Sequence, residues 1–343
     1  MALRWGILAA GAIARVFAND LTIIDPTRKK HRITSVASRD AERAARFATE
    51  FDIPRSFGSY SGVLESDDVD VVYVANVQSS HHEVVMAALH AGKNVLCEKP
   101  LALNLRQVDE MFGLAAAKKL FLMEAMWTRF LPHITSILTM IRDGVIGRPR
   151  FVIADHGQWV YRKKNHRLLD PHQGGGALLD LGIYPITLAH LILGMPEQVL
   201  ARASFTESGV DSDVSIALHY SDGRSATLHT TIESVTATRA LIAGEEGRIE
   251  IDRSFYAPTG FTLYRNDGEV RRYENPLQVP GYVGIGEQVH EVARCIDSGE
   301  TESPLRTYQD TREVMAIMEK VRHQIGLRYP SEISDPDDSS RIP

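Results

Sequence analysis

A lysine in this chain stands where an open sheet would bind a ligand. Lys99 follows a short apolar run, Asn94–Cys97, that is typical of a buried strand. In open α/β sheets, ligands bind beyond the carboxyl ends of the strands. A lysine ammonium at such an end can stabilise the alkoxide that forms when a hydride leaves a carbon atom. The position therefore makes Lys99 a candidate for such a role; the alternative is a surface lysine in a turn.

Two further reactive side chains lie on a helix that we expect over about Ala177–Leu193. Asp180 and Tyr184 are four residues apart, so both project from one face of that helix. A phenol can relay a proton when a neighbouring cation favours its ionised form, and Lys99 is the candidate cation. Asp180 would hold Lys99 or a substrate hydroxyl in place. We interpret Lys99, Asp180 and Tyr184 as catalytic; the alternative for Tyr184 is packing in the core.

The turn after the first expected strand carries a degenerate dinucleotide-binding fingerprint. It reads Ala9-x-Gly11-x-x-Ala14 where the pattern has G-x-G-x-x-G. Gly11 lets the backbone approach a pyrophosphate, and the amides of Ala12 and Ile13 would face its phosphates at a helix start. A P-loop is excluded, because Ala12 and Ile13 stand where lysine and serine or threonine are required.

The end of the second expected strand, Ile33–Ser38, distinguishes the two nicotinamide cofactors. An acidic residue there would bind the ribose 2′-hydroxyl of NAD and repel a 2′-phosphate. This chain instead has Ser38, which can donate a hydrogen bond to a phosphate, and Arg39, which can pair with it. The adjacent Asp40 argues the other way. On balance the sequence favours NADP.

The pattern of secondary structure changes near residue 126. Before it, five apolar strand-like runs alternate with helical patterns, which predicts a parallel, doubly wound sheet. After it, consecutive strands with tight turns favour a large, mostly antiparallel sheet. We therefore expect an α/β protein with an NADP-binding Rossmann domain at 1–125, a substrate-binding and dimerisation α+β domain at 126–330, and a polar tail at 331–343. The tail contains Asp335, Asp337 and Asp338 and should be loosely ordered.

Composition is that of an ordinary globular protein of two domains, with 343 residues, 44% hydrophobic and 24% charged. The net charge of −6 and the lack of a basic block argue against nucleic-acid and anionic-membrane partners. No apolar run approaches the length of a membrane span, and the N-terminus does not resemble a signal peptide. The two cysteines, Cys97 and Cys295, are expected to be reduced, buried thiols in a cytoplasmic protein. The histidines have no zinc-binding spacing, so no metal is expected.

Four segments, taken together and in order, resemble the Gfo/Idh/MocA family of oxidoreductases: Asn76–His81, Cys97–Pro100, Trp127–Pro132 and Gly174–Tyr184. Within that family the chain is similar to the branch of dihydrodiol dehydrogenases and NADP-dependent D-xylose dehydrogenases. The shared runs are Leu-Cys-Glu-Lys-Pro, Phe-Leu-Met-Glu-Ala-x-Trp-Thr-Arg-Phe and Gly-Gly-Ala-Leu-Leu-Asp-Leu-Gly-Ile-Tyr. The similarity extends to about residue 330. Most of the family carries histidine where this chain and its branch have Tyr184.

The resemblance implies roles for further residues. Those implied to contact the cofactor are Asn76, Gln78, His81, Glu98, Lys99 and Arg129, although the family often has Thr-Pro-Asn-x-x-His in the first of these segments. Those implied to line the substrate pocket are Trp127, His156, Asp180 and Tyr184. The loop Val160–Gln173 would shape that pocket, and its path stays open. The resemblance also points to a homodimer, or a dimer of dimers, through the antiparallel sheet, whose strand Ser225–Ile232 carries Thr and His on one face.

The function that the resemblance implies is reversible oxidation of a CH–OH group on a sugar or cyclic diol. NADP would accept the hydride, and the expected substrates are D-xylose-like aldopyranoses and trans-dihydrodiols. Two alternatives stay open. One is reduction of a keto-sugar or anhydro-sugar by the same residues; the other is a non-catalytic NADP-binding redox regulator.

Overall fold

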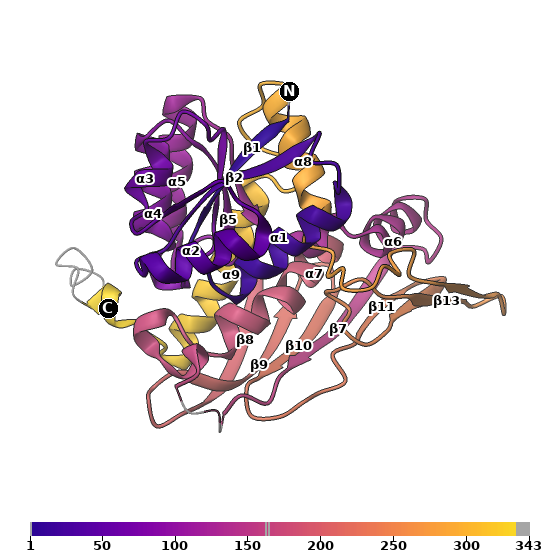
Figure 1. Ribbon diagram of the computed structural model, residues 1–343. Helices are drawn as coiled ribbons and strands as arrows, with labels where there is room; N and C mark the ends of the chain where they lie inside the picture. Colours follow the sequence, from indigo (N-terminus) through magenta and orange to yellow (C-terminus); the bar gives the residue numbers. More distant parts are fainter. Residues whose placement is uncertain (1, 162, 164, 334–343) are drawn as a thin grey trace. The chain divides into compact units, whose positions relative to one another are not determined.

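The computed structural model describes residues 2–161, 163 and 165–333, and the chain divides into two compact units (Figure 1). The first consists of Met1–Leu131 and Leu277–Arg312, and the second of Pro132–Pro276 and Glu313–Pro343. Leu277–Arg312 thus lies in the first unit, whereas the sequence analysis gave it to the second domain. A buried carboxylate accounts for this, because Asp20 accepts hydrogen bonds from the amides of Val283 (3.0 Å) and Gly286 (3.2 Å).

The first unit has a six-stranded parallel sheet in the order β3-β2-β1-β4-β5-β6. Its strands are β1 (Leu3–Leu8), β2 (His31–Ala37), β3 (Arg55–Phe57), β4 (Val71–Val74), β5 (Asn94–Glu98) and β6 (Leu122–Ala125). Every residue of β4 is buried, as expected for a strand covered on both faces. The strand order reverses between β1 and β4, which creates the crevice where such sheets bind ligands.

The helices of the first unit are α1 (Ala12–Ile24), α2 (Ala41–Phe51), α3 (Ser61–Leu64), α4 (His81–His90), α5 (Leu105–Lys118) and α8 (Glu287–Asp297). Helix α1 packs beside α2, and α4 packs beside α5. Polar side chains cap the starts of two of these helices: Asp40 accepts from the Arg43 amide at α2, and Asn104 from the Gln107 amide at α5. The Rossmann arrangement that the sequence predicts is confirmed.

The second unit has an eight-stranded sheet in the order β14-β13-β12-β11-β7-β10-β9-β8. Its strands are β7 (Pro149–Gly157), β8 (Gln198–Phe205), β9 (Asp211–His219), β10 (Ser225–Thr231), β11 (Ala240–Gly244), β12 (Gly247–Ile251), β13 (Phe261–Arg265) and β14 (Val270–Tyr273). All neighbours are antiparallel except β7 and β10, which are parallel. The predicted fold class is therefore confirmed, with two additional strands, β13 and the edge strand β14, that were not predicted from the sequence.

The remaining helices are α6 (Pro132–Arg142), α7 (Ile183–Leu193), α9 (Tyr308–Ile325) and α10 (Pro330–Ile333). Helix α7 packs on β7 and β10. Among the described residues, Pro171–Leu193 is the one helical stretch long and apolar enough to cross a membrane, and 89% of its apolar window is buried, as in the core helix of a unit. Ser331 and Glu332, expected in a loose tail, belong to α10; Asp335, Asp337 and Asp338 lie outside the described residues.

One face of the second sheet carries a continuous row of exposed and half-buried side chains. The strand registers align Leu200, Ala217, Thr227, Ile153 and Leu241 on five neighbouring strands. Ile153 is 44% exposed and Leu200 46%. The next row is polar, with His229 within 3.2 Å of Asp213 and 3.3 Å of Ser215. This face therefore presents an apolar row beside a polar one.

Candidate functional site

In the first unit, the loop that carries Lys99 is held from the neighbouring strand. Lys99 directly follows β5 and is half-buried. The carboxylate of Glu98, the last residue of β5, accepts a hydrogen bond from the hydroxyl of Tyr73 on β4 (2.5 Å) and one from the Lys99 amide (3.3 Å). Glu98 is buried, so these contacts replace the water that its charge loses. They fix the backbone from which the Lys99 side chain starts.

His81 joins the loop after β4 to the loop after β5. Its Nδ1 lies 2.8 Å from the carbonyl oxygen of Pro100, and its Nε2 lies 3.1 Å from that of Asn76. Burial lowers the pKa of His81, with the Lys99 charge acting in the same direction. The resemblance implied that His81 contacts the cofactor. In the structure both ring nitrogens face backbone carbonyls, so His81 links these two loops, and its contact with the cofactor stays a prediction.

A buried ion pair on the neighbouring strand β6 also holds the loop that carries Lys99. Glu124 on β6 accepts a hydrogen bond from the Leu101 amide (2.9 Å) through one carboxylate oxygen. Its other oxygen pairs with the guanidinium of Arg306, through Nε at 3.1 Å and Nη2, and contacts the hydroxyl of Thr311. Glu124 and Arg306 are 2% and 1% exposed. Neither residue could be predicted from the sequence, since Arg306 is 182 residues from Glu124 along the chain.

The turn between β1 and α1 leaves room for a ligand above its backbone. A Cβ atom at Gly11 would meet no atom of the described residues within 4 Å. Gly11 is the N-cap of α1, and no side chain caps the helix, so its first amides are available to an acceptor. Ala9 stands at the first glycine of the fingerprint with a φ of 88°, in the region that favours glycine. The substitution therefore keeps the tight turn and strains it.

The loop after β2 holds the residues from which the preference for NADP was predicted. Ser38 is buried and Arg39 is exposed. The carboxylate of Asp40, the acidic neighbour, accepts a hydrogen bond from the Arg43 amide at 2.9 Å and caps α2. The cap uses Oδ1 of Asp40, whose side chain is 47% exposed.

Several buried polar atoms of the first unit have no hydrogen-bond partner within the described residues, and two of them follow strands of the sheet: Oδ1 of Asn76 and Nε of Arg129. Asn76 follows β4 and Arg129 lies in the 3₁₀ turn Trp127–Phe130 after β6, beyond the carboxyl ends of their strands. Burial lowers the pKa of Arg129. Buried polar atoms normally find a partner, so these two are candidate contacts for a bound ligand. Gln78 and Trp127 are buried in the same two loops.

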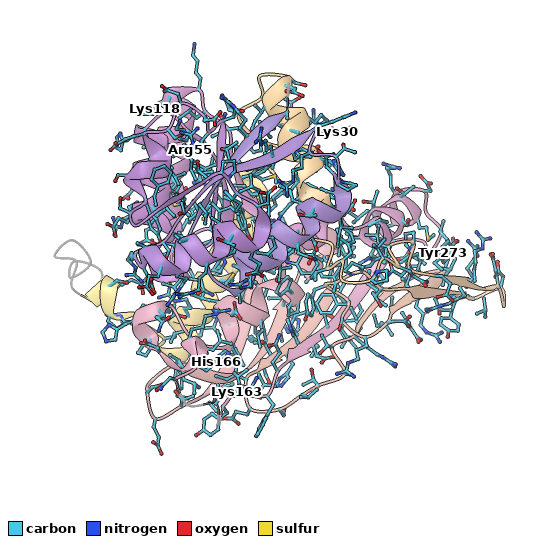
Figure 2. All side chains as sticks on the ribbon, viewed as in Figure 1. Lys30, Arg55, Lys118, Lys163, His166 and Tyr273 are labelled. Atoms are coloured by element: carbon cyan, nitrogen blue, oxygen red, sulfur yellow. The ribbon has the colours of Figure 1, made fainter. Side chains whose placement is uncertain are left out.

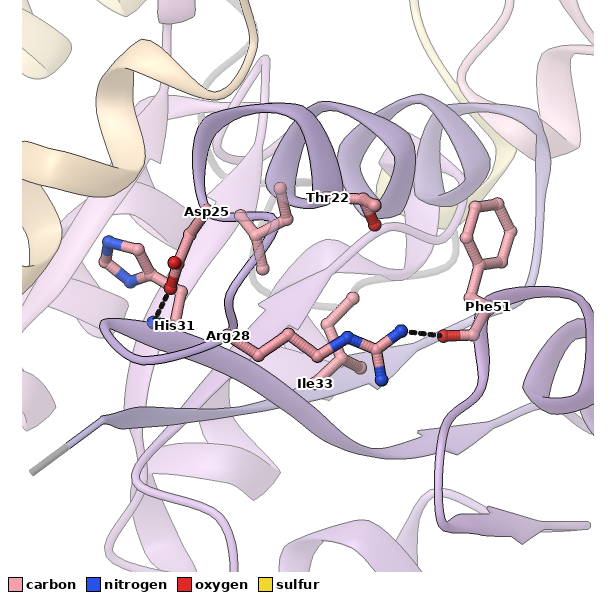
Figure 3. Close-up of a pocket in the computed structure, with 7 residues that line it drawn as sticks. Thr22, Asp25, Arg28, His31, Ile33 and Phe51 are labelled. Carbon is pink, nitrogen blue, oxygen red and sulfur yellow. Dashed lines mark hydrogen bonds between the residues drawn. The ribbon is translucent and has the colours of Figure 1, made fainter.

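A pocket also opens at the opposite edge of the first sheet (Figure 3). It is lined by Leu21, Thr22, Asp25, Arg28, His31, Ile33 and Phe51. His31 is the first residue of β2, so this pocket lies at the amino end of the strands. Arg28 is already bound there to the carbonyl of Phe51 and the carboxylate of Asp52. The pocket is thus distinct from the crevice that binds a dinucleotide.

In the second unit, Asp180 lies in a π-helical turn. The turn spans Leu178–Gly182 and leads into α7, where the sequence analysis predicted one regular helix. Turns of this kind inside helices occur frequently at functional sites. Asp180 is buried, and its Oδ1 lies 2.9 Å from Nη2 of Arg167. Arg167 belongs to the loop Val160–Gln173, whose Lys163 and His166 are labelled in Figure 2. The sequence analysis did not assign this arginine to the site.

Tyr184 packs in an aromatic cluster of the second unit. Its ring centroid lies 5.4 Å from that of His156 on β7 and 4.7 Å from that of Tyr256. His156 and Tyr256 stack at 4.3 Å with an angle of 24° between their rings. The structure thus brings together two of the predicted site residues, Tyr184 and His156, and adds Tyr256. Nothing in the sequence near Tyr256 marks it, because it lies in an irregular segment between β12 and β13.

Both parts of the chain match models of one protein family. Residues 3–126 match the model described as an oxidoreductase family with an NAD-binding Rossmann fold, and residues 134–250 match the GFO/IDH/MocA C-terminal domain. The trans-1,2-dihydrobenzene-1,2-diol dehydrogenase of Xenopus tropicalis is 35% identical over 337 residues, which cover 96% of this chain and 100% of that protein. The human protein of the same name is 33% identical over 339 residues, 97% of this chain and 99% of that one.

Solved structures show the same fold over nearly the whole chain. A 3-ketoreductase from Actinomadura kijaniata, in complex with NADP and TDP-benzene, has a TM-score of 0.84 and 28% identity, covering 95% of this chain and 98% of that one. An aldose-aldose oxidoreductase from Caulobacter crescentus, complexed with glycerol, has a TM-score of 0.83 and 25% identity, covering 94% and 97%.

Proposed function

The chain belongs to the GFO/IDH/MocA family of oxidoreductases, and from this premise we propose that it transfers a hydride between NADP and a CH–OH group of a sugar or cyclic diol. It is an NAD(P)-dependent oxidoreductase that acts on CH–OH substrates. The proposal goes further in naming NADP, and D-xylose-like aldopyranoses and trans-dihydrodiols as substrates. The alternative from another class, a non-catalytic NADP-binding redox regulator, does not agree with membership of this family of oxidoreductases.

The observation that carries the proposal is the anchored loop after β5, where Glu98, His81 and Glu124 hold the backbone on both sides of Lys99. When bound, the nicotinamide accepts the hydride. The Lys99 ammonium stabilises the oxyanion that develops as the C–H bond breaks. Tyr184 takes the hydroxyl proton, and Asp180 orients the substrate hydroxyl. The ring of Tyr256 would pack on the apolar face of a cyclic substrate.

A turnover screen tests this function. Purified protein is assayed for NADPH formation with a panel of aldopyranoses and cyclic trans-diols, each compared with its acyclic polyol. We expect turnover with at least one ring substrate. Binding of NADPH without turnover on any member, in either direction, would overturn the proposal.

A second candidate is reduction of a keto-sugar, which the likeness to a 3-ketoreductase favours. It is the same hydride transfer in reverse and needs the same side chains. The screen separates the two when keto-sugars are included with NADPH and the specificity constants kcat/KM are compared for the two directions.

Replacing Arg39 should weaken the preference for NADP. Charged hydrogen bonds of this kind are worth about 1.5–3 kcal/mol, so Arg39→Ala should raise the Kd of NADP about 10- to 150-fold and leave that of NAD nearly unchanged. Titration calorimetry with both cofactors measures this. Arg46→Ala is the matched control, since Arg46 is an exposed arginine of α2 that pairs with Glu42. Equal affinity of the unmodified protein for NAD and NADP would refute the assignment.

We also propose a homodimer, or a dimer of dimers, formed through the open face of the second sheet. The mainly apolar row Leu200–Ala217–Thr227–Ile153–Leu241, in which Leu200 and Ile153 are the most exposed apolar side chains, is a surface of the kind that meets a partner. A two-fold axis would place the same row on both subunits, which makes the contact self-complementary.

Ile153→Asp should convert this assembly to monomers, because it would bury a charge in the centre of the interface. Light scattering at micromolar concentration measures the mass. Leu305→Asp serves as control, since Leu305 is a similarly exposed apolar residue of the first unit, at 41%. A monomeric mass for the unmodified protein would rule out this assembly.

A further inference from the structure

Asp211 is a buried carboxylate at the start of the helix that carries Asp180 and Tyr184. It is the first residue of β9 and is fully buried. Its Oδ2 accepts a hydrogen bond of 2.6 Å from the amide of Leu178, which opens the π turn. The first amides of a helix have no partner inside it and need an outside acceptor. A strand 33 residues further along the chain provides that acceptor.

The other carboxylate oxygen determines which residue can precede the helix. A Cβ atom at Gly176 would lie 2.0 Å from Oδ1 of Asp211, and Gly176 has a φ of 111°. Only glycine therefore allows the carboxylate to reach the helix start. From another direction, the hydroxyl of Tyr329 donates to the carbonyl of Gly175 at 2.9 Å. The run Gly174–Gly176 is thus held in place by contacts with Asp211 on β9 and with Tyr329 in the segment after α9.

The burial of Asp211 favours a carboxylate that titrates near neutral pH. Burial raises the pKa of Asp211 to about 7, against the amides of Leu178 and Ala177 and the charge of Arg322, which lower it. Arg322 on α9 pairs with Glu332 on α10 and lies 4.8 Å from the centroid of the Tyr329 ring. Burial also raises the pKa of Tyr329, so it stays neutral. Asp211 is therefore protonated below about pH 7 and ionised above it.

We propose that Asp211 is a positioning residue for hydride transfer: by capping the helix start across Gly176, it sets the place of Asp180 and Tyr184. The ionised carboxylate is the stronger acceptor and complements the positive end of the helix dipole, so it holds the helix better than the neutral acid. This inference rests on the proposed function. A displacement of about 1 Å at a reacting group can lower the rate about 100-fold.

Two substitutions and a matched control test the inference. Asp211→Ala removes the cap and should lower kcat about 10- to 100-fold with little change in the KM of NADP. Asp211→Asn keeps a neutral acceptor and should resemble the unmodified protein at pH 6. The kcat of the unmodified protein divided by that of Asp211→Asn should then grow as the pH rises through 7. Asp20→Asn is the control, because Asp20 is also fully buried and accepts the amide of Gly286 at the start of α8.

The Asp20 variant should lose stability and keep kcat. Equal losses of kcat in the Asp20 and Asp211 variants, or a pH-independent ratio for Asp211→Asn, would overturn the inference. Amide hydrogen exchange of residues 177–184 provides a readout that does not need turnover. Exchange should become faster in Asp211→Ala and not in Asp20→Asn. Unchanged exchange in Asp211→Ala would contradict the capping role even if no substrate is turned over. Absence of turnover in the unmodified protein would count against the proposed function alone.

Discussion

Tyr184→Phe should lower kcat by about 10²–10⁴-fold, the usual contribution of a positioned general acid or base. The change removes only the hydroxyl, and the ring keeps its contacts with His156 and Tyr256, so the aromatic cluster and the fold should survive. The loss should fall on kcat more than on KM, because proton transfer occurs in the transition state. Steady-state kinetics with the best substrate of the screen measures both constants.

Lys99→Met should cost at least as much turnover, since it removes the ammonium and keeps similar bulk. The Kd of NADPH should change little, because the loop is anchored through Glu98 and the Leu101 amide and not through the Lys99 side chain alone. The double variant is the decisive measurement. If both groups act on one proton relay, the combined loss should be close to the larger single loss and far below their product.

The control for these variants is Tyr256→Phe, which removes a hydroxyl from the same aromatic cluster. Tyr256 has no assigned part in proton transfer, so its kcat should stay within a few-fold of the unmodified value. Near-normal turnover of Tyr184→Phe would show that Tyr184 is a packing residue, and the assignment of the relay would then be wrong.

The fold could be predicted from the sequence wherever runs of apolar residues or helix-capping residues gave a strong local signal. Buried strands such as β4, with apolar residues throughout, and capped helices such as α2 have clear local signals. The edge strand β14 does not, because it reads Val-Arg-Arg-Tyr and most of it is exposed. The π turn Leu178–Gly182 was also missed. The start of this turn contacts the Asp211 carboxylate across Gly176, and these residues come together only in the folded unit.

The candidate site residues also divide into those that could be predicted from the sequence and those that could not. Lys99, Asp180 and Tyr184 could be proposed because each stands in a motif with a chemical reason. Arg167, Glu124 and Arg306 could not, since each acts through a partner far away in sequence or in an irregular loop. His81 was recognised as a site residue, but its contacts with two carbonyls depend on how the loops after β4 and β5 approach each other. Local sequence carries no information on that approach.

Arg306→Met should lower the free energy of unfolding by about 3–5 kcal/mol, the usual result of leaving one charge of a buried ion pair without its partner. The side chains of Arg306 and Glu124 are 1% and 2% exposed, so water cannot replace the lost guanidinium. Urea denaturation followed by fluorescence measures the change. Arg312→Met is the matched control, because Arg312 pairs with Asp109 at 3.2 Å on the surface, with exposures of 48% and 41%. Surface pairs of this kind are worth about 0–1 kcal/mol.

Adding Glu124→Gln to Arg306→Met should recover part of the lost stability, since the uncompensated charge disappears and the amide oxygen can still accept the Leu101 hydrogen bond. The non-additivity of the two changes measures the coupling between them. The double variant should also retain more turnover than Arg306→Met, because the Leu101 contact, and with it the backbone next to Lys99, is kept. If Arg306→Met lost no more stability than Arg312→Met, the pair would not be the buried support of the Lys99 loop that its geometry indicates.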